Sequence, residues 1–505
     1  MTQKIFGATD AFNAFNADDA GGAAPPLRFD PATIRRLSTS GPRYTSYPTA
    51  DRFSADFGYG SYLEAVAGLK MRGGGRGPLS LYVHVPFCDT VCYYCGCNKI
   101  VTKDRSKAAT YLSYLKQEIG MQGKLFSGMN QIGQLHFGGG TPTYLSDRQM
   151  DELMAHLRKN FEFAPDDEGE YSIEIDPRTV SRERVHSLRA QGFNRVSLGV
   201  QDFDPEVQKA VNRIQPEEET LAVMQAARDA GFRSISIDLI YGLPKQTLDS
   251  MRRTMAKVIA AAPDRIALYN YAHLPHLFKP QRRILDADLP PADVKLDMLA
   301  LCIRELTTAG YVYIGMDHFA KPQDDLAVAQ RQGRLHRNFQ GYSTHAEADL
   351  VAVGVSAIGS VGNTYSQNEK TLEAYYEKLD QGVLPVARGI KLNTDDLLRR
   401  IIIQKLMCSF ELSIASIEMA YPLRFADYFA TELAQLGALE EDGLVAIDSE
   451  WLSVTLKGRL LVRNVCMVFD RYLGMPRAQE GGTCSATAGA GTAADPRPLR
   501  YSKTI

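Results

Sequence analysis

Four of the eight cysteines lie within ten residues, in the sequence HVPFCDTVCYYCGCNK. They are Cys88, Cys92, Cys95 and Cys97. Structural zinc sites usually pair two C-x2-C knuckles that a dozen or more residues separate, and no second knuckle follows here. Three closely spaced thiolates on one loop instead suit a [4Fe–4S] cluster that keeps one iron free of protein ligands. Zinc binding is the alternative to this interpretation.

A glycine triplet, HFGGGTPTYL, provides a second feature with chemical meaning. Glycine lets the backbone adopt positive φ or come close to a ligand, although a plain turn has the same composition. Charged and amide side chains, Glu174, Gln201, Arg213 and Asp238, then recur near the ends of later strand-like runs. Each alone fits a loop-bracing role, but their shared location favours a binding site for a polar, charged ligand.

Alternating short and long segments predict the elements that position these residues. Apolar, β-branched runs predict strands over 79–85, 133–137, 171–175, 195–200, 234–240 and 265–271. Amphipathic runs predict helices over 108–121, 147–161, 183–192, 217–231 and 248–262. Six βα units imply a parallel sheet, and because a closed barrel needs eight, we expect an α/β fold with an open, partial (β/α)6 barrel. Ligands would lie at the carboxyl ends of its strands.

Outside this repeat the sequence predicts four further regions. Residues 1–34 are rich in Ala, Gly, Asp and Asn and predict a disordered extension. Residues 35–78 predict an N-terminal segment that covers the active site, in which GPRYTSYPTADRFS from Gly41 is expected to be extended. The barrel is expected over 79–290. Residues 291–475 predict a mainly helical domain whose last part, a helix, a two-stranded wing over 442–456 and a closing helix, resembles a winged helix. Residues 476–505 predict a low-complexity tail.

Composition limits the classes of partner. The 505 residues carry a net charge of −2, and the winged region has no basic stripe, so we expect no nucleic-acid partner. No window approaches the roughly 20 apolar residues of a membrane helix, and no signal peptide is evident, so we expect a cytoplasmic protein with reduced thiols and no membrane contact. Nothing in the sequence demands an oligomer, and a monomer is expected.

The position of C-x3-C-x2-C just after a first barrel strand resembles the radical S-adenosylmethionine (SAM) superfamily. More specifically, the sequence is similar to the oxygen-independent coproporphyrinogen III oxidase family of haem biosynthesis. The likeness covers residues from about 35 to about 475. The motifs that carry it are PRYTSYPTA, YVHVPFCDTVCYYCGCNKIVT, HFGGGTPTYL, EIDPR, GFNRVSLGVQDF, DLIYGLPKQT, YNYAHLP, GMDHFA, LHRNFQGY and GVSAIG.

The resemblance implies a role for each matching residue. Cys88, Cys92 and Cys95 would hold the [4Fe–4S] cluster, whereas Cys97 would take a catalytic or site-shaping role near the reacting centre. Two SAM molecules are implied. Positions that contact the first are Tyr82, Gly139 and Glu174, and positions that contact the second are Tyr94, Gly140, Thr141, Gln201, Arg213, Asp238, Ala272 and Ile358.

The reaction that the resemblance implies is the oxidative decarboxylation of two propionates of coproporphyrinogen III to the vinyl groups of protoporphyrinogen IX. Each decarboxylation would begin with hydrogen abstraction at the propionate β-carbon by a 5′-deoxyadenosyl radical. A low-potential reductant such as flavodoxin or ferredoxin would supply electrons. An apolar substrate with four carboxylates requires apolar walls and cations or polar donors at the rim, for which Arg43, His318, His336 and Arg337 are the candidates.

Two other functions remain to be weighed against the oxidase. A radical-SAM-like haem chaperone would bind haem without decarboxylation and would share the three cysteines and the glycine turn. In that group the cysteine loop continues as Cys-x-Phe and the GMDHF histidine is replaced, so Cys97, Asn98 and His318 favour the oxidase. An RNA-modifying radical enzyme lacks the basic patch that it would require.

Overall fold

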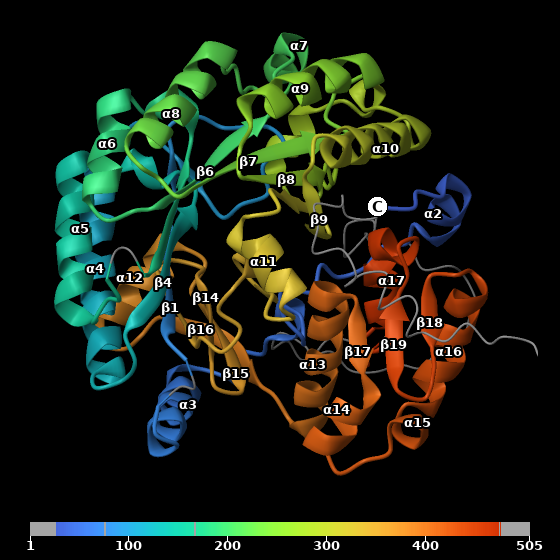
Figure 1. Cartoon of the computed structure of the whole chain (residues 1–505). Coiled ribbons are helices and arrows are strands. Elements are labelled where there is room, and N and C mark those ends of the chain that lie inside the picture. The colour runs from blue at the N-terminus through green and yellow to red at the C-terminus, as the bar shows by residue number, and fades with distance from the viewer. Residues whose placement is uncertain (1–26, 75–76, 166–167, 474, 476–505) are drawn as a thin grey trace, which may run out of the picture.

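Six parallel strands form the middle of a twelve-stranded sheet in the computed structural model (Figure 1), which describes residues 27–74, 77–165, 168–473 and 475. They are, in spatial order, β1 (Leu79–Val85), β4 (Ile132–Gly139), β5 (Glu170–Ile175), β6 (Arg195–Gln201), β7 (Ser234–Tyr241) and β8 (Arg265–Asn270). Most of their residues are buried, as expected for parallel strands covered on both faces. The predicted partial barrel is confirmed.

Helices cross between these strands and cover the outer face of the curved sheet (Figure 1). They are α4 (Ser106–Phe126), α5 (Asp147–Asn160), α6 (Arg182–Ala190), α7 (Pro205–Ala210), α8 (Glu217–Asp229), α9 (Leu248–Ala261) and α10 (Ala292–Thr308). Local sequence sets several of their starts. Ser146 and Gln149 form a capping box at the beginning of α5, and Thr247 and Ser250 form another at α9.

The sheet continues past the predicted boundary at residue 290, which differs from the expected mainly helical pattern. Beside β1, β13 (Leu350–Val353) is parallel, and β14 (Ile358–Val361), β15 (Thr364–Asn368) and β16 (Val386–Lys391) follow in antiparallel order. At the opposite edge, β10 (His318–Ala320) and β9 (Val312–Gly315) extend the sheet beyond β8. These strands have three to six residues, too few for period-two alternation to indicate them.

Shorter elements lie near these added strands. They are η4 (Lys279–Arg283), η5 (Asp286–Asp288), α11 (Asp325–Arg331), the hairpin of β11 (His336–Asn338) and β12 (Gly341–Ser343), and α12 (Leu372–Asp380). The hairpin packs against the last domain, because Gln404 bonds both the backbone N–H and the carbonyl of Arg337.

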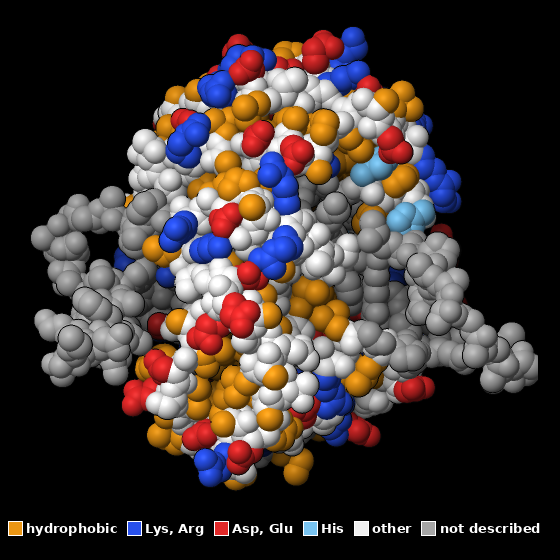
Figure 2. Space-filling model, turned by 90° about the vertical axis from the view of Figure 1, so that its right-hand side faces the viewer, with side chains coloured by type: hydrophobic (Ala, Val, Ile, Leu, Met, Phe, Trp, Pro, Cys, Tyr) orange, Lys and Arg blue, Asp and Glu red, His pale blue; other side chains and the backbone are white. Residues whose placement is uncertain are grey.

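The last domain lies beside the barrel, in the orange and red region of Figure 1, and is mainly helical. Its elements are α13 (Thr394–Ser409), β17 (Glu411–Ser413), α14 (Ile414–Ala420), α15 (Phe425–Tyr428), α16 (Ala430–Glu441), β18 (Val445–Ile447), β19 (Trp451–Val454), η6 (Gly458–Leu461) and α17 (Val462–Val468). The three strands form a small sheet, so helix α16, the β18–β19 wing and α17 follow the predicted winged order. On the face drawn in Figure 2, positive and negative side chains are interspersed.

The segment before β1 connects the barrel to the last domain. It contains α2 (Pro31–Leu37), η1 (Ala50–Arg52) and α3 (Tyr59–Met71). Between α2 and η1 the chain forms no helix and has two buried aromatic side chains: Tyr44 and Tyr47 are 1% exposed, and the Tyr44 hydroxyl donates to Asp470 Oδ2 at 3.0 Å. Arg463 of α17 donates to the Pro42 carbonyl at 2.9 Å.

The predicted boundary at the start of this segment requires a correction. The boundary at 34/35 falls inside α2, which Pro31 and the capping carboxylate of Asp30 start, so the described end of the supposed extension is helical. Within 35–78, α3 is a helix that contacts β14, β15 and β16. The predicted disorder of 1–26 and the tail over 476–505 lie outside the described residues. No helix among the described residues is long and apolar enough to span a bilayer.

Candidate active site

The cysteine loop leaves the sheet at the carboxyl end of β1. It begins in β2 (Phe87–Cys88) and ends in β3 (Ile100–Val101), and these two short strands are parallel neighbours. The Thr102 N–H donates to the Cys88 carbonyl at 3.0 Å, which closes the base of the loop. Lys99 Nζ donates to the Cys95 carbonyl at 3.1 Å. Three of the four clustered cysteines therefore lie between two paired strand ends, and the fourth, Cys88, lies within β2.

Hydrogen-bond donors lie beside two of the predicted cluster ligands. Thr141, which precedes η2 (Pro142–Tyr144), has its hydroxyl 3.6 Å from Cys88 Sγ. Arg213 Nη1 lies 3.5 Å from Cys92 Sγ, and Arg178 Nη2 lies 3.8 Å from the same sulfur. Burial raises the pKa of the Cys88 thiol to about 11, and the Thr141 hydrogen bond opposes that shift. The donors favour thiolates, the form that binds metal.

Cys97 lies next to Cys95 rather than apart from the predicted ligands. Its side chain is exposed, and the two thiols hydrogen bond to each other. This bond lowers the pKa of Cys95 and raises that of Cys97. The catalytic role of Cys97 stays a prediction. Among the described residues no three His, Cys, Asp or Glu side chains form a single-ion site, whereas the ligands of a cubane bind separate irons.

Asp176, Arg178 and Arg213 form what we term the balanced group beside Cys92. Asp176 N-caps η3 (Pro177–Thr179) and pairs with Arg178 at 2.6 Å and with Arg213 at 3.2 Å. Asp176 is 8% exposed and Arg213 6%. Burial opposes ionisation of Asp176, but the two guanidinium groups hold its pKa below the usual range. Both arginines thus have a carboxylate partner within the group, which keeps one net positive charge where it contacts a cluster ligand.

The glycine turn places backbone against the end of β1. Gly139 has a φ of +118°, and a Cβ there would lie 2.6 Å from the His84 ring. A Cβ on Gly140 would lie 2.7 Å from the Phe87 carbonyl oxygen. The protein's own packing therefore requires both glycines, and they fix the turn to the start of the cysteine loop.

Glu174 and Asp238 bring two carboxylates into the barrel from β5 and β7. Glu174 accepts from the Gly139 N–H at 3.2 Å and lies 3.3 Å from His136 Nε2. Burial raises the pKa of Glu174, but His136 and Gly139 more than offset this, so the carboxylate is ionised. Burial, and then the charge of Glu174, raise the pKa of Asp238 to about 7. Asp238 is therefore poised between its two protonation states.

The remaining predicted cofactor residues form smaller sets. Gln201, at a φ of +67°, and Arg213 both lie against Gly199, where a Cβ would meet their side chains at 2.9 and 3.0 Å. Gln281 Nε2 joins Tyr94 to Ala272, because it donates to the Tyr94 carbonyl at 2.9 Å and the Ala272 carbonyl at 3.2 Å. Ile358 instead packs in an apolar cluster with Phe53, Tyr365 and Leu392.

Sequence reasoning missed several polar residues in this site, among them His84, Asp176 and Gln281. Tyr82 donates to or accepts from His84 Nδ1 at 3.0 Å, and its ring stacks on His136 at 5.8 Å. Since residues two apart on a strand share a face, Tyr82 predicts His84, and Glu174 likewise predicts Asp176. For Gln281, which is 2% exposed in η4, no motif signals its role.

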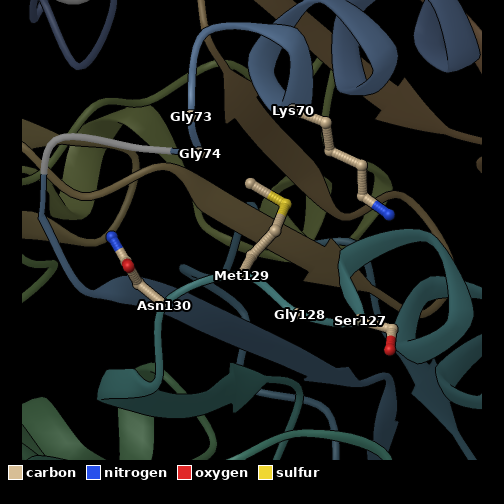
Figure 3. A pocket seen from close by; sticks show the side chains of 7 residues that line it. All are labelled: Lys70, Gly73, Gly74, Ser127, Gly128, Met129 and Asn130. Atoms are coloured by element: carbon tan, nitrogen blue, oxygen red, sulfur yellow. The ribbon is translucent and has the colours of Figure 1, made fainter.

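A separate cavity of about 360 Å³ lies at the opposite end of the strands (Figure 3). Its lining comes from the end of α3 and from the turn between α4 and β4, and comprises Lys70, Gly73, Gly74, Ser127, Gly128, Met129 and Asn130. None of the predicted site residues lines it. The cavity is therefore not part of the site at the carboxyl ends.

A partial parallel barrel with three cysteines on the loop after its first strand defines the radical SAM class. The family model "Radical SAM superfamily" matches residues 82–258, and the model "HemN C-terminal domain" matches 392–461.

Relatives narrow this class to one family. The chain is 54% identical to the oxygen-independent coproporphyrinogen III oxidase of Escherichia coli K12, over 88% of this chain and 96% of that protein. It is 44% identical to the Synechocystis protein of the same name, over 89% and 96%. The crystal structure of the E. coli enzyme, described as a radical SAM enzyme, superimposes with a TM-score of 0.84 at 51% identity, over 89% of this chain and 100% of that chain. The chain belongs to the oxygen-independent coproporphyrinogen III oxidase family.

The cofactors of this family, a [4Fe–4S] cluster and SAM, fit the residues present. Three thiols lie on one loop with hydroxyl and guanidinium donors at two of the sulfurs. Arg213 Nε is buried without a hydrogen-bond partner, as expected for a donor that a bound group completes. The donor set is thus suited to an anionic cluster and a ligand with polar groups.

Proposed function

We propose that this chain catalyses the oxygen-independent oxidative decarboxylation of two propionates of coproporphyrinogen III to vinyl groups, which yields protoporphyrinogen IX in haem biosynthesis. Family membership supports this reaction. The observation that carries the proposal is the cysteine loop at the end of β1, where the balanced group and Thr141 place donors against Cys92 and Cys88. The chaperone alternative is not favoured, since the named relatives are oxidases.

In this proposal the residues divide between three tasks. Cys88, Cys92 and Cys95 hold the cluster. Tyr82, Gly139 and Glu174 contact one SAM molecule, and Tyr94, Gly140, Thr141, Gln201, Arg213, Asp238, Ala272 and Ile358 contact a second. When bound, cluster and SAM would supply the 5′-deoxyadenosyl radical, which would take one hydrogen atom from a propionate β-carbon to form 5′-deoxyadenosine. The substrate radical would then release carbon dioxide and pass one electron to an external acceptor, which leaves the vinyl group. Cys97, with its exposed thiol beside Cys95, acts at or shapes the reacting centre.

The electrostatics of the barrel support these tasks. The ionised Glu174 suits a cationic amino or sulfonium group, since a carboxylate stabilises a nearby positive charge. Asp238 is partly protonated, so that it can donate to or accept from hydroxyl groups. The buried tyrosines and the N-terminal segment that lies between barrel and last domain exclude water from a reactive intermediate.

The compartment, the electron donor and the oligomeric state are also proposals. We place the enzyme in the cytoplasm, because the three cysteines must stay reduced to bind the cluster. A reductant is required by the chemistry, and we propose flavodoxin or ferredoxin. We propose that the chain works as a monomer, because nothing in the sequence demands an oligomer.

The test is anaerobic reconstitution of the full chain with iron and sulfide, followed by incubation with dithionite, SAM and coproporphyrinogen III. We expect 5′-deoxyadenosine and decarboxylated porphyrin, which chromatography and mass spectrometry detect after oxidation. Tight haem binding without either product would contradict the oxidase and support the chaperone. The same incubation without substrate measures background SAM cleavage.

A further inference from the structure

Two arginines, Arg43 and Arg337, lie close to His318, and we term these three residues the cation-rich group. Arg337 on β11 is 2% exposed and stacks over Tyr342 of β12 at 4.8 Å. Its Nε donates to the Arg43 carbonyl at 3.3 Å. His318 of β10 packs edge-on against Tyr342 at 5.2 Å. The group therefore joins the N-terminal segment, the β11–β12 hairpin and the edge of the sheet.

The cation-rich group has more positive charge than the protein neutralises. Arg43 pairs with Asp317, but among the described residues no carboxylate forms an ion pair with Arg337. Arg337 Nη1 and His318 Nδ1 are buried without hydrogen-bond partners. A buried donor without a partner costs free energy, and a buried cation without a counter-charge costs more. Such an arrangement is expected where a ligand supplies the missing acceptors.

Neighbouring charges confirm that the cations act on one another. Burial, and then the charge of Arg337, lower the pKa of Arg43 to about 10, so Arg43 stays charged at pH 7. Burial and the same two arginines lower the pKa of His318 far below its usual value, which leaves the imidazole neutral. An anion bound here would meet two guanidinium groups and one neutral ring nitrogen.

Tyr269 connects this group to the cofactor side of the barrel. Arg43 lies over the Tyr269 ring at 5.5 Å, and His318 packs against that ring at 6.0 Å. Tyr269 is on β8, next to β7, and after burial the charge of Asp238 is the main cause that raises the pKa of Tyr269. The cation-rich group is thus one aromatic ring away from Asp238.

We propose that Arg337 and Arg43, with His318, bind a propionate carboxylate of the substrate. This inference rests on the proposed function, because that function supplies a ligand with four carboxylates and an apolar ring. Guanidinium groups bind carboxylates in a planar, two-point geometry. The rings of Tyr269 and Tyr342 pack against His318 and give the group an aromatic surrounding. Each propionate that is held here fixes the macrocycle relative to Asp238 and the cysteine loop.

His336, which the sequence predicts for the same carboxylate-binding role, lies apart from the cation-rich group. His336 precedes Arg337 on β11, so the two side chains point to opposite faces of the strand. Burial, and then the charge of Arg400, lower the pKa of His336 to about 4. His336 pairs across the hairpin with Ser343, whereas Arg337 pairs with Tyr342. His336 is therefore excluded from the carboxylate site.

The test compares two ligands in the reconstituted full chain. Coproporphyrin III, which has four free carboxylates, and its tetramethyl ester are titrated anaerobically against wild type and Arg337→Gln, and quenching of porphyrin fluorescence gives each Kd. Loss of a hydrogen-bonded charge should weaken coproporphyrin III binding about 10- to 100-fold in Arg337→Gln. The ester, which lacks the carboxylate, should bind wild type and variant equally.

Control variants exclude a general effect of charge or folding. Lys405→Gln removes one positive charge from an exposed position on α13 and should change the Kd less than twofold. Arg337→Lys keeps the charge but not the planar fork, and should recover part of the affinity. Iron content and thermal unfolding report whether each variant folds. If Arg337→Gln does not fold, Arg43→Gln, which has a side chain 32% exposed, must show the same acid-specific loss.

The outcomes separate the carboxylate site from the proposed function. The methionine part of SAM also carries a carboxylate, so SAM binding to each variant is measured by equilibrium dialysis. An unchanged Kd for coproporphyrin III, an equal loss for acid and ester, or a loss for SAM instead of porphyrin would overturn the carboxylate site. A wild-type chain that neither binds coproporphyrin III nor decarboxylates its reduced form would refute the function itself.

Discussion

Two groups of arginines lie near the site, and they differ in whether every arginine has a carboxylate partner. In the balanced group, Asp176 pairs with both Arg178 and Arg213 beside Cys92. In the cation-rich group, Asp317 pairs with Arg43, and among the described residues no carboxylate pairs with Arg337. The first group contacts the cysteine loop, and the second is the group for which we propose carboxylate binding.

This difference relates the pairing of a buried arginine to the role of that arginine. A cation that must position a cysteine loop before any cofactor binds needs an internal counter-charge, because an unpaired buried ion would destabilise the empty protein. A cation that recognises substrate gains specificity when the ligand supplies that counter-charge instead. An arginine without a carboxylate partner lowers stability, and such a loss is common at functional sites. The following predictions test this division.

The largest effect is expected for the cysteines beside the balanced group. Cys95→Ser should lose the cluster and all activity, because one iron would lack its ligand. Cys97→Ser should keep its iron, because Cys97 is not assigned to the cluster. Iron and sulfide analysis after anaerobic reconstitution measures both. If Cys97→Ser loses iron as completely as Cys95→Ser, the division into three ligands and one further thiol is wrong.

Asp176→Asn should have the next largest effect, since two buried arginines would lose their counter-charge. We expect the free energy of unfolding to fall by about 4 kcal/mol, measured by urea denaturation of the protein without cofactors. Asp147→Asn is the matched control, because Asp147 pairs with Arg184 but its side chain is 56% exposed. The control should lose less than about 1 kcal/mol. Equal losses would show that the balanced group has no special structural role.

Asp238 lies between the two groups and predicts a pH dependence. Its pKa in the folded protein is about 7, above the ordinary 3.8, so the folded state favours the protonated carboxyl. Ionisation of Asp238 therefore lowers the free energy of unfolding as pH rises from about 4 to about 7. The decrease should be roughly 3 kcal/mol, a value that allows for the partial exposure of the side chain.

Asp238→Asn should remove this dependence. Without cofactors, the variant should gain stability over wild type as pH rises through this window and keep that gain above it. Denaturation of both proteins between pH 5 and pH 8 measures the difference, in which other titrating groups cancel. A constant difference, or a wild type that becomes the more stable as pH rises, would contradict a raised pKa.

Asp317→Asn should have the smallest effect. Arg43 is about one-third exposed, so loss of its ion pair should cost about 1 kcal/mol or less. Because Asp317 competes with a bound carboxylate for Arg43, the variant should bind coproporphyrin III about twofold more tightly. Weaker binding in Asp317→Asn would mean that this carboxylate positions Arg43 rather than competes with the ligand.

The sequence predicted the barrel and the cysteine loop because both depend on local patterns. Long apolar strands and amphipathic helices reveal the six βα units, and cysteine spacing needs no tertiary information. The strands β9 to β16 escaped prediction because they are short and pair with distant partners, as β13 does with β1. Their assignment requires knowledge of the sheet that they extend.

The site residues also divide into those that local sequence predicts and those that only the fold brings together. Glu174 was predictable because it ends a strand, and Asp176 follows from it by alternation. Gln281 was not, since only the fold brings its amide to the carbonyls of Tyr94 and Ala272. The exclusion of His336 and the choice of Arg337 also depend on strand register, which two adjacent residues in LHRNFQGY cannot reveal.

The most direct test of the central claim follows one hydrogen atom. Coproporphyrinogen III that carries deuterium at the propionate β-carbons is incubated anaerobically with the reconstituted chain, dithionite and SAM, and the 5′-deoxyadenosine is analysed by mass spectrometry. If the barrel positions the substrate for hydrogen abstraction, 5′-deoxyadenosine should contain deuterium and should form together with decarboxylated porphyrin. Unlabelled 5′-deoxyadenosine at the same yield with and without substrate would contradict the account.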